Sequence, residues 1–333
     1  MRNIFDWLEA TADLQLYDST ALIYEDMASQ SGKSLPIIYQ PFDANRKAHW
    51  RDRGAALDYL LSTGARGRRV LDFGPGDGWP SLIIAPQVAE VVGVDGSPRR
   101  VQVCTENAAR LGLSNARFLA VPPDSSLPFA DGSFDAAVAA SSVEQTPDPF
   151  FTLAELYRLL RPGGRLRLSY EALARYRGGQ ETDVWLLEID AQTSRLLLYD
   201  RQVEQERVVQ YGLTFRLSEA DLLAVLAAGE PMSEKITLPK LQSLSDRLLD
   251  VGKCVTHHPS GRTLVGWLAQ IGFREIRPSH NGLDAAAYLF EQTAAAERPL
   301  TVTAVDTYLE PFVQMAIELA APLEMDPMIT AVK

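Results

Sequence analysis

The sequence predicts an α/β protein: a sheet with helices on both faces, plus an inserted antiparallel β-meander with its own helices. Strand-like and helix-like stretches alternate from residue 68 to about 170, which is typical of a parallel sheet between helices. Near residue 173 the pattern changes to closely spaced strands, and at about 263 the α/β pattern returns. These two changes divide the chain into three regions.

The first region, 1–64, has helical periodicity and is expected to form an N-terminal helical cap. Apolar residues from Trp50 to Leu61 recur at helical spacing. Gly64 follows them, at a position where a left-handed residue commonly ends a helix.

Residues 65–172 and 263–333 are expected to form one domain around the sheet. Ser97 is placed to cap a helix that begins at Pro98. A later helix and strand share the stretch 261–278, and two further helices, at 283–297 and 303–320, precede a last strand at 327–333. The earlier strands are predicted over 68–73, 90–95, 116–121, 134–140 and 164–170, and the earlier helices over 81–89, 97–113 and 148–161.

The inserted region, 173–262, is expected to cap a substrate or to form a dimer interface. We predict a meander over 183–217, a helix over 218–229 with Ser218 and Asp221 at its start, and a second helix over 241–252. An exposed strand at the edge of such a meander could pair with a second copy in a homodimer. Six side chains could line a substrate pocket or form a plain hydrophobic face: Trp185, Leu187, Leu197, Tyr199, Tyr211 and Phe215.

Composition indicates a globular, cytoplasmic protein. Hydrophobic residues make up 46% of the chain, enough for a sizeable core. The net charge is −11 and no long basic run is present, so we expect no nucleic-acid partner. Cys104 and Cys254 have neither disulfide-scaffold nor metal-site spacing, so no metal is expected. The N-terminus does not resemble a signal peptide, and no apolar run is long enough to span a membrane.

A glycine-rich turn, "VLDFGPGDGWP", follows the first strand of the sheet. In open α/β sheets, ligands bind beyond the carboxyl ends of the strands, so this turn is the expected site. Gly74, Gly76 and Gly78 let the backbone turn tightly and approach a ligand closely. A dinucleotide loop needs its third glycine at position 79, which is Trp79.

The acids around this turn indicate a nucleoside with a charged amino-acid end. Asp72 precedes the alternating glycines by two residues, close enough to influence an ammonium group. Asp95 ends the next strand, where a carboxylate can accept hydrogen bonds from both ribose hydroxyls. Dinucleotides share the second anchor, so only the glycine spacing separates the two cofactor classes.

Four blocks in this order resemble the class I S-adenosylmethionine (SAM)-dependent methyltransferases, especially their small-molecule branch. They are "VLDFGPGDG", "VVGVDGS", "SLPFADGSFDAAVAASSVEQTPDP" and "LAELYRLLRPGGRLRLS". The later segment "LVGWLAQIGFREIRP" resembles the family's last helix and strand. The resemblance implies a Rossmann-like seven-stranded sheet, SAM as cofactor and S-adenosylhomocysteine as its product.

The resemblance also implies roles for individual positions. Residues expected around the methionine end are Asp72, Gly74, Gly76, Gly78, Ser141 and Ser142. Asp95 would hold the ribose, while Gly96 and Ser97 would border the adenine. Asp124 would contact the adenine amino group, although it lies one residue nearer to Leu127 than in the family pattern.

Methyl transfer from a sulfonium needs positioning above all, and a base only where the acceptor must lose a proton. Candidates for acceptor contacts are Glu144, after the fourth strand, Tyr170 and Glu171, after the fifth, and His280, after the later strand. Each could also have a purely structural role. The sequence therefore predicts a SAM-dependent methyltransferase acting on a small molecule. An NAD(P)-dependent oxidoreductase and a non-catalytic SAM-binding partner protein remain the alternatives.

Overall fold

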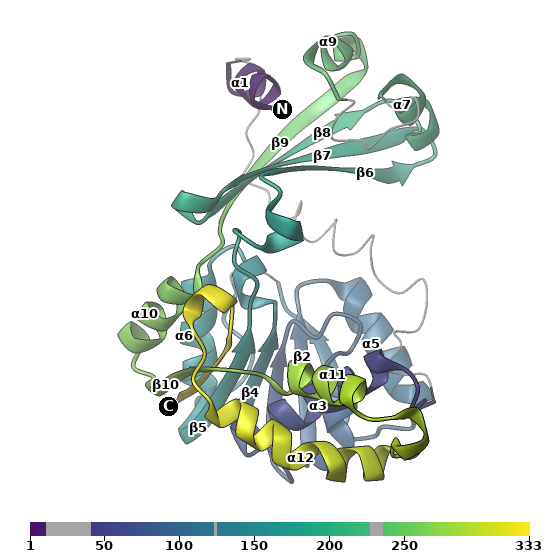
Figure 1. Ribbon diagram of the computed structural model, residues 1–333. Coiled ribbons are helices and arrows are strands. Elements are labelled where there is room, and N and C mark those ends of the chain that lie inside the picture. Colours follow the sequence, from purple (N-terminus) through teal and green to yellow (C-terminus); the bar gives the residue numbers. More distant parts are fainter. Residues whose placement is uncertain (11–40, 123–124, 227–235) are drawn as a thin grey trace. The chain divides into compact units, whose positions relative to one another are not determined.

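The computed structural model describes residues 1–10, 41–122, 125–226 and 236–333 (Figure 1). The chain divides into two compact units. One comprises Met1–Ser29 with Leu173–His258, and the other comprises Gln30–Ala172 with Pro259–Lys333. The region 1–64 therefore contributes to both units: the helix α1 (Arg2–Ala10) belongs to the first, and α3 (Lys47–Thr63) belongs to the second.

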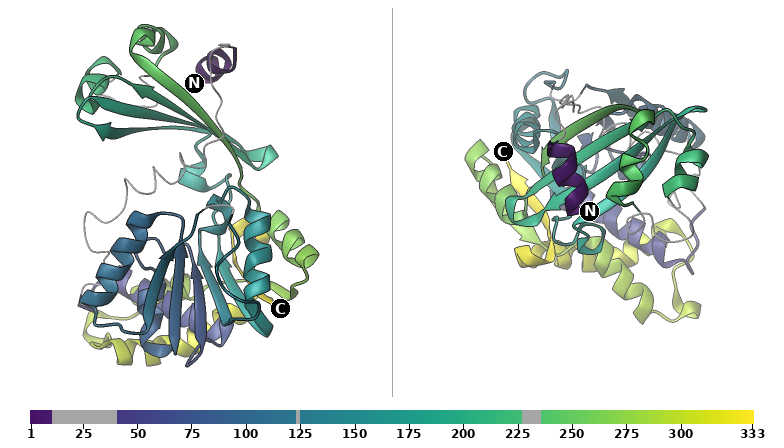
Figure 2. Two further views of the ribbon diagram at one scale, coloured as in Figure 1. Left: turned by 180° about the vertical axis from the view of Figure 1, so that it is seen from behind. Right: turned by 90° about the horizontal axis from the view of Figure 1, so that it is seen from above.

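The second unit contains a seven-stranded sheet with the order β10-β11-β5-β4-β1-β2-β3 (Figure 2, left). This confirms the predicted seven-stranded α/β fold. Five adjacent strands, β5, β4, β1, β2 and β3, run parallel to one another. The strands are β1 (Arg69–Phe73), β2 (Glu90–Asp95), β3 (Ala116–Ala120), β4 (Phe134–Ala140), β5 (Leu160–Ser169), β10 (Arg274–Ser279) and β11 (Met328–Val332).

The sheet departs from an all-parallel arrangement at β11, which runs antiparallel to both β5 and β10. The reason lies in where the chain returns to the sheet. Ala320 pairs with Ser279 at the carboxyl end of β10, and β11 then begins at Met328, also opposite Ser279. A strand that enters at this edge must run back along β10.

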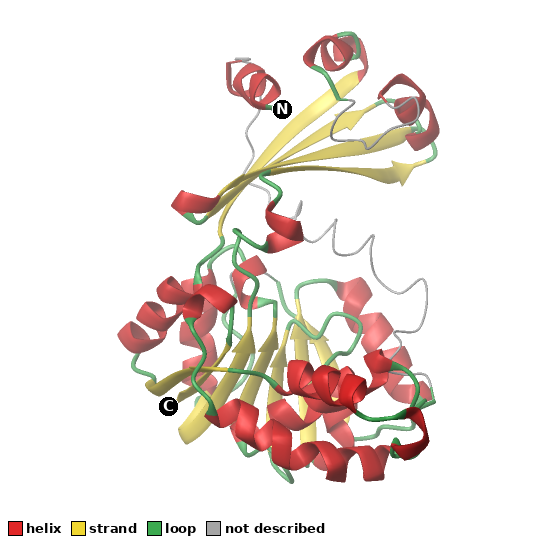
Figure 3. Cartoon of the chain, viewed as in Figure 1, coloured by secondary structure: helices red, strands yellow, loops and turns green. Residues whose placement is uncertain are grey.

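Helices cover both faces of this sheet, as predicted (Figure 3). Apolar side chains of α3 and α4 (Ser81–Ile84) cluster with Val70, Val91 and Val138 on one face. Leucines of α6 (Pro149–Leu159) and α10 (Gly261–Ile271) cluster with strand residues on the other face. The helix α5 (Pro98–Arg110) begins at the predicted cap, because the Ser97 hydroxyl accepts a hydrogen bond from the Arg100 N–H. Gly64 ends α3 in the left-handed conformation, with φ of 64°.

Two further helices, α11 (Gly282–Gln292) and α12 (Val302–Glu318), pack with α3 in one apolar cluster. The crossing of α3 and α11 is close because both helices present a glycine there. A Cβ added at Gly54 would lie 2.2 Å from the Gly282 carbonyl oxygen. A Cβ at Gly282 would lie 2.4 Å from the Gly54 oxygen and 2.7 Å from Val313. No side chain fits at either position without separating the helices.

A buried ion pair also fixes α3 to the sheet. The Arg167 side chain of β5 and the Asp58 side chain of α3 are both fully buried and form two hydrogen bonds of 2.8 and 2.9 Å. Arg167 also donates to Ser279 and Thr330, and Asp58 accepts from the Gly282 N–H at 2.7 Å. The pair thus joins α3, β5, β10, β11 and α11.

The first unit is a four-stranded antiparallel sheet with the order β6-β7-β8-β9. The predicted meander is confirmed in β6 (Thr182–Asp190), β7 (Thr193–Gln202) and β8 (Arg207–Phe215). The fourth strand, β9 (Leu248–His257), pairs with β8 along its whole length.

The predicted helix over 241–252 is wrong beyond Gln242. A short helix, α9 (Leu238–Gln242), and a 3-10 turn end before Leu248, where β9 begins. Leu241, Leu244 and Leu248 all contribute to the hydrophobic core of this unit, so their spacing resembled a helical face. Pairing with β8 outweighs this local pattern, because strand preference depends strongly on tertiary context.

The six apolar side chains considered for a pocket do not all lie on one face of the four-stranded sheet. Leu198 pairs with Tyr211 and Leu197 pairs with Gly212, so Tyr211 points to the same side as Leu198. That side is covered by α1, α7 (Glu219–Leu226) and α9, and it also buries Phe215. The other side carries a separate cluster with Trp185, Leu187, Leu197, Tyr199 and Cys254.

No helix among the residues that the structure describes is long and apolar enough to cross a membrane.

Candidate functional site

The candidate site lies at the carboxyl ends of β1, β2 and β4. β1 has β2 on one side and β4 on the other, so the strand order reverses here, as expected for a ligand site in an open α/β sheet. Gly74, Gly76 and Gly78 have φ of 71°, 56° and 111°, all in the region that favours glycine. A Cβ at Gly74 would lie 2.4 Å from the Cβ of Ser142, so only glycine fits between the two loops.

Asp72 is fully buried beneath this loop. Its Oδ2 accepts hydrogen bonds from the Ser81 N–H at 2.9 Å and from the Ser81 hydroxyl at 2.6 Å. Its Oδ1 has no hydrogen-bond partner among the described residues. Burial raises the pKa of Asp72 to about 7, although the bonds from Ser81 act in the opposite direction. Asp72 therefore ties β1 to α4 and keeps one buried oxygen available.

Asp95 is 8% exposed at the end of β2. Its Oδ1 accepts the Ser97 N–H at 2.8 Å, and its Oδ2 accepts the Gly76 N–H at 3.3 Å. Burial raises the pKa of Asp95, and the two backbone hydrogen bonds oppose that rise. Because each carboxylate oxygen can accept more than one hydrogen bond, both oxygens keep capacity for a ligand hydroxyl.

The helix α5 holds the glycine loop from one side. The Cys104 thiol lies 3.0 Å from the Gly76 carbonyl oxygen, and the Asn107 amide donates to the Asp77 carbonyl at 3.1 Å. Ser97 is buried and caps the helix, with Gly96 between it and Asp95. These contacts fix the backbone around the candidate site.

Sequence reasoning missed Arg100. A Cβ at Gly76 would lie 2.9 Å from Nη1 of Arg100, so the guanidinium lies directly against the loop. Its charge also lowers the pKa of Asp95. The position of Arg100 in the first turn of a helix that begins three residues after Asp95 was the available signal.

Ser141 and Ser142 follow β4 and join its end to both neighbouring strands. The Ser142 hydroxyl donates to the Phe73 carbonyl at 2.6 Å, at the end of β1. The Ser141 N–H donates to the Ser169 carbonyl at 3.1 Å, at the end of β5. Both serines thus lie at the same edge as the glycine loop. Asp124, the predicted adenine contact, lies outside the described residues.

Glu144 lies two residues after Ser142 and is 2% exposed. Its Oε1 accepts the Glu171 N–H at 3.2 Å, and its Oε2 has no hydrogen-bond partner among the described residues. Burial raises the pKa of Glu144 to about 8, and the charges of Glu171 and Asp326 add to this rise. Glu144 therefore keeps its proton to a higher pH than an exposed glutamate does.

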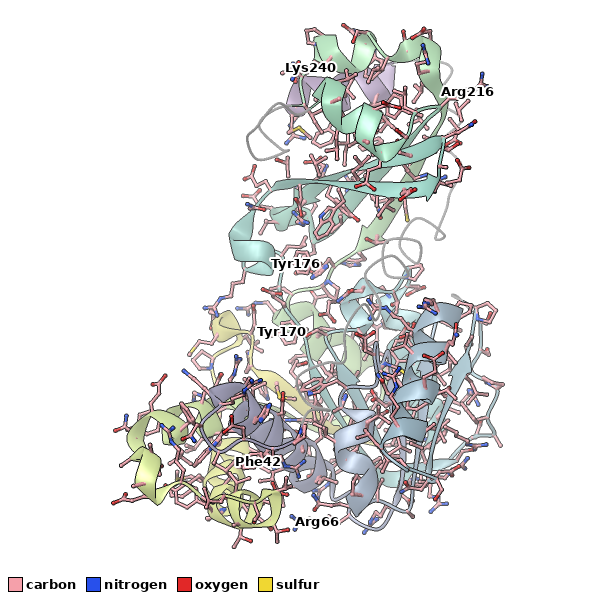
Figure 4. The ribbon with its side chains drawn as sticks, turned by 90° about the vertical axis from the view of Figure 1, so that its right-hand side faces the viewer. Phe42, Arg66, Tyr170, Tyr176, Arg216 and Lys240 are labelled. Atoms are coloured by element: carbon pink, nitrogen blue, oxygen red, sulfur yellow. The ribbon has the colours of Figure 1, made fainter. Side chains whose placement is uncertain are left out.

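Tyr170 and Glu171 share this region, but His280 does not. Tyr170 is buried at the end of β5 (Figure 4), and a Cβ at Gly261 would lie 1.9 Å from its hydroxyl oxygen. His280 is exposed after the edge strand β10, which β11 and β5 separate from β4. Its N–H donates to the Leu319 carbonyl at 3.1 Å. The structure brings Glu144 and Glu171 together through the hydrogen bond from the Glu171 N–H, and Tyr170 precedes Glu171 in the chain.

The raised pKa of Glu144 predicts a pH-dependent stability. The unfolded chain releases this proton near pH 4.5, whereas the folded unit keeps it until about pH 8. The folded state binds more protons within this window, so the free energy of unfolding should fall as the pH rises from about 4.5 to about 8. Glu144→Gln should remove part of that fall in urea titrations, whereas Glu318→Gln, at the surface, should not. An unchanged fall in Glu144→Gln would contradict the assignment.

Trp79 occupies the position where a dinucleotide loop has its third glycine. The indole packs edge-on against the Tyr59 ring of α3, with ring centroids 5.8 Å apart. A bulky side chain at this position opposes the close approach of helix and pyrophosphate that a dinucleotide requires.

The strand order and the glycine loop define a Rossmann-like α/β domain, and comparison with known proteins identifies its family. Residues 71–168 match the family model described as a methyltransferase domain. Together with the sheet topology, this shows that residues 71–168 belong to a methyltransferase domain.

The relatives match this domain over a limited length. An uncharacterized methyltransferase of Mycobacterium sp. (strain KMS) is 38% identical over 116 residues, which are 35% of this chain and 44% of that protein. Demethylmenaquinone methyltransferase of Thermus thermophilus is 39% identical over 119 residues, which are 35% of this chain and 51% of that protein. The CcbJ methyltransferase of Streptomyces caelestis aligns over 93% of this chain and 96% of its own, with 15% identity and a TM-score of 0.48. In the first two of these matches, the chain spans about half the length of the curated relative.

Proposed function

We propose that the protein transfers the methyl group of SAM to a small-molecule acceptor. The observation that carries the proposal is the Asp95 carboxylate, which the N–H groups of Gly76 and Ser97 hold at the end of β2 inside a methyltransferase domain. In this position the carboxylate is suited to accept hydrogen bonds from the two ribose hydroxyls.

The residues around the glycine loop fit a ligand with an amino-acid end. Asp72 keeps a buried oxygen without a partner among the described residues, and a buried acceptor of this kind favours a donor such as an ammonium group. The alternating glycines leave the backbone open to close approach. When bound, SAM supplies a methyl group that is already activated on a positively charged sulfonium. The protein then has to orient the acceptor and exclude water.

Glu144 is suited to take a proton from the acceptor. It lies next to the loops that hold the cofactor region, its Oε2 has no partner among the described residues, and its pKa of about 8 is close to the operating pH of a cell. A base matched in this way accelerates reactions by about 10²–10⁴-fold. A base is needed only where the acceptor loses a proton, so this role for Glu144 implies an acceptor with an O–H or N–H group.

A small-molecule acceptor agrees with the name of one relative, demethylmenaquinone methyltransferase, which acts on a small molecule. The acidic net charge of −11 also does not favour a nucleic-acid substrate. We propose the aqueous cell interior as the site of action.

The proposal is tested by incubating the purified protein with methyl-labelled SAM and a metabolite extract of its source organism. Transfer of label to a small product, with release of S-adenosylhomocysteine, is the expected result. Binding of S-adenosylhomocysteine without any transfer would favour a non-catalytic SAM-binding protein. Protein that retains NAD or NADP but does not bind S-adenosylhomocysteine would favour the oxidoreductase. Glu144→Gln should slow transfer while leaving S-adenosylhomocysteine binding unchanged.

A further inference from the structure

The helix α12 carries two apolar faces, and only one of them is buried. Val305, Leu309, Val313 and Ile317 face the cluster shared with α3 and α11. A helix at the surface of a domain normally needs one such stripe. A second stripe is only partly covered. Tyr308 is 36% exposed and packs edge-on against Trp50, and Phe312 is 37% exposed beside the Tyr308 ring. Met315 is 55% exposed, and Leu319, at the C-cap, is 53% exposed.

The outer stripe carries no charge, although the molecule as a whole has a net charge of −11. Helical geometry places Thr301, Ala304 and Pro311 beside the stripe, and none of them is ionisable. Two of the three acids of α12 form ion pairs, and the third, Glu318, is exposed and accepts a hydrogen bond from Gln314. Asp306 forms an ion pair with Arg53, and Glu310 forms one with Arg66, which Figure 4 labels. Two copies of this acidic chain could approach at the stripe without placing like charges against one another.

The spacing of the stripe favours a second copy of the same helix. Its four residues are separated by four, three and four positions, the alternation of a helix–helix seam. This spacing is the same in both directions along the helix. An antiparallel pair, related by a two-fold axis between residues 313 and 314, places Tyr308 opposite the partner's Leu319. The same axis places Phe312 opposite the partner's Met315, and thioether–aromatic contacts of this type are favourable.

We propose that the protein forms a symmetric homodimer in which α12 packs antiparallel against α12 of a second copy. Such an interface is isologous, because the same patch serves both copies. A standard interface buries about 800 Å² of each partner, more than four side chains supply. Leu300, 78% exposed just before the N-cap Thr301, adds apolar surface at one end of the stripe.

The alternative dimer, through the edge strand β6 of the four-stranded sheet, is less well supported. The edge strand β6 carries Asp183, Glu188 and Asp190, and a second copy paired there would bring these acids together. Charged side chains on an edge strand typically prevent such pairing. A membrane is also a poor partner for α12, because the stripe has no flanking lysine or arginine to bind anionic lipid.

The test is sedimentation equilibrium of the full chain at micromolar concentration. The wild type should sediment at about twice the chain mass of 36.7 kDa, and Met315→Glu should raise the dimer dissociation constant at least about 100-fold. Leu249→Glu is the matched control, because it places the same charge on a side chain 47% exposed on β9. It should remain dimeric. A monomeric wild type would overturn the proposal, as would a dimer that Leu249→Glu breaks and Met315→Glu does not.

A cross-linking experiment tests the register without introducing charge. Tyr308→Cys and Leu319→Cys are mixed and treated with a short bismaleimide. The antiparallel pair should cross-link one variant to the other, at least about 10-fold more than either variant to itself. Positions 308 and 319 lie opposite each other, whereas the two copies of position 308 lie about 16 Å apart along the helix axis. The two native cysteines are buried. Equal self- and cross-linking would overturn the antiparallel arrangement.

Discussion

Asp95→Ala should weaken S-adenosylhomocysteine binding at least about 100-fold. The carboxylate is held by two backbone N–H groups and is suited to accept hydrogen bonds from two ribose hydroxyls. Hydrogen bonds to a charged group contribute about 1.5–3 kcal/mol each, so losing two costs about 3–6 kcal/mol. Each 1.4 kcal/mol is a factor of about ten in affinity. Isothermal titration measures the change directly.

Two further variants make the Asp95 result specific. Asp131→Ala removes an acid whose side chain is 78% exposed in the same unit, and it should bind S-adenosylhomocysteine as the wild type does. Asp95→Asn keeps the shape and one acceptor oxygen, so its affinity should fall between those of the wild type and Asp95→Ala. If Asp95→Ala folds normally and retains affinity within a factor of about three, the ribose assignment is wrong.

Asp58→Ala should lower the free energy of unfolding by about 3–5 kcal/mol, because it leaves the buried Arg167 charge without its partner. The loss also removes the acceptor for the Gly282 N–H. Hydrogen exchange measures the local stability of peptides from α3, β5 and β10, and exchange in all three should accelerate. The urea midpoint of the same unit should fall in parallel.

The surface pair Arg66–Glu310 provides the matched control for Asp58. Its side chains are 44% and 40% exposed, and such pairs contribute about 0–1 kcal/mol. Arg66→Ala should therefore change stability little. The double variant Asp58→Leu with Arg167→Met removes both charges and should recover part of the loss, since buried ion pairs are often replaceable by apolar residues. A small effect of Asp58→Ala would mean that the pair stabilises the fold less than its burial indicates.

Much of the sheet could be predicted because its local patterns and its tertiary structure agree. The Ser97–Pro98 start of α5 and the left-handed Gly64 are local features that the fold retains. The glycine loop was predictable because positive φ at Gly74, Gly76 and Gly78 needs glycine wherever the loop occurs. The sequence also predicted that Asp72 and Asp95 lie at the ends of adjacent strands, as they do.

The rest depends on contacts that are distant in sequence. β9 forms because β8 is available to pair, which the leucine spacing around Leu244 does not reveal. The separation of Tyr211 from Leu197 follows from the register of β7 and β8, which single strands do not specify. Arg100 lies against Gly76 only once α5 is packed, and His280 lies far from Glu144 only once the strand order is known.

The contacts of α5 with the glycine loop have a consequence for recognition. Ordering the backbone of one residue costs about 1–2 kcal/mol of conformational entropy. Hydrogen bonds hold the turn from 74 to 78: Asn107 donates to the Asp77 carbonyl, the Cys104 thiol lies against the Gly76 carbonyl, and the Gly76 N–H donates to Asp95. A ligand that binds this turn therefore spends little of its binding free energy on ordering the backbone of the loop.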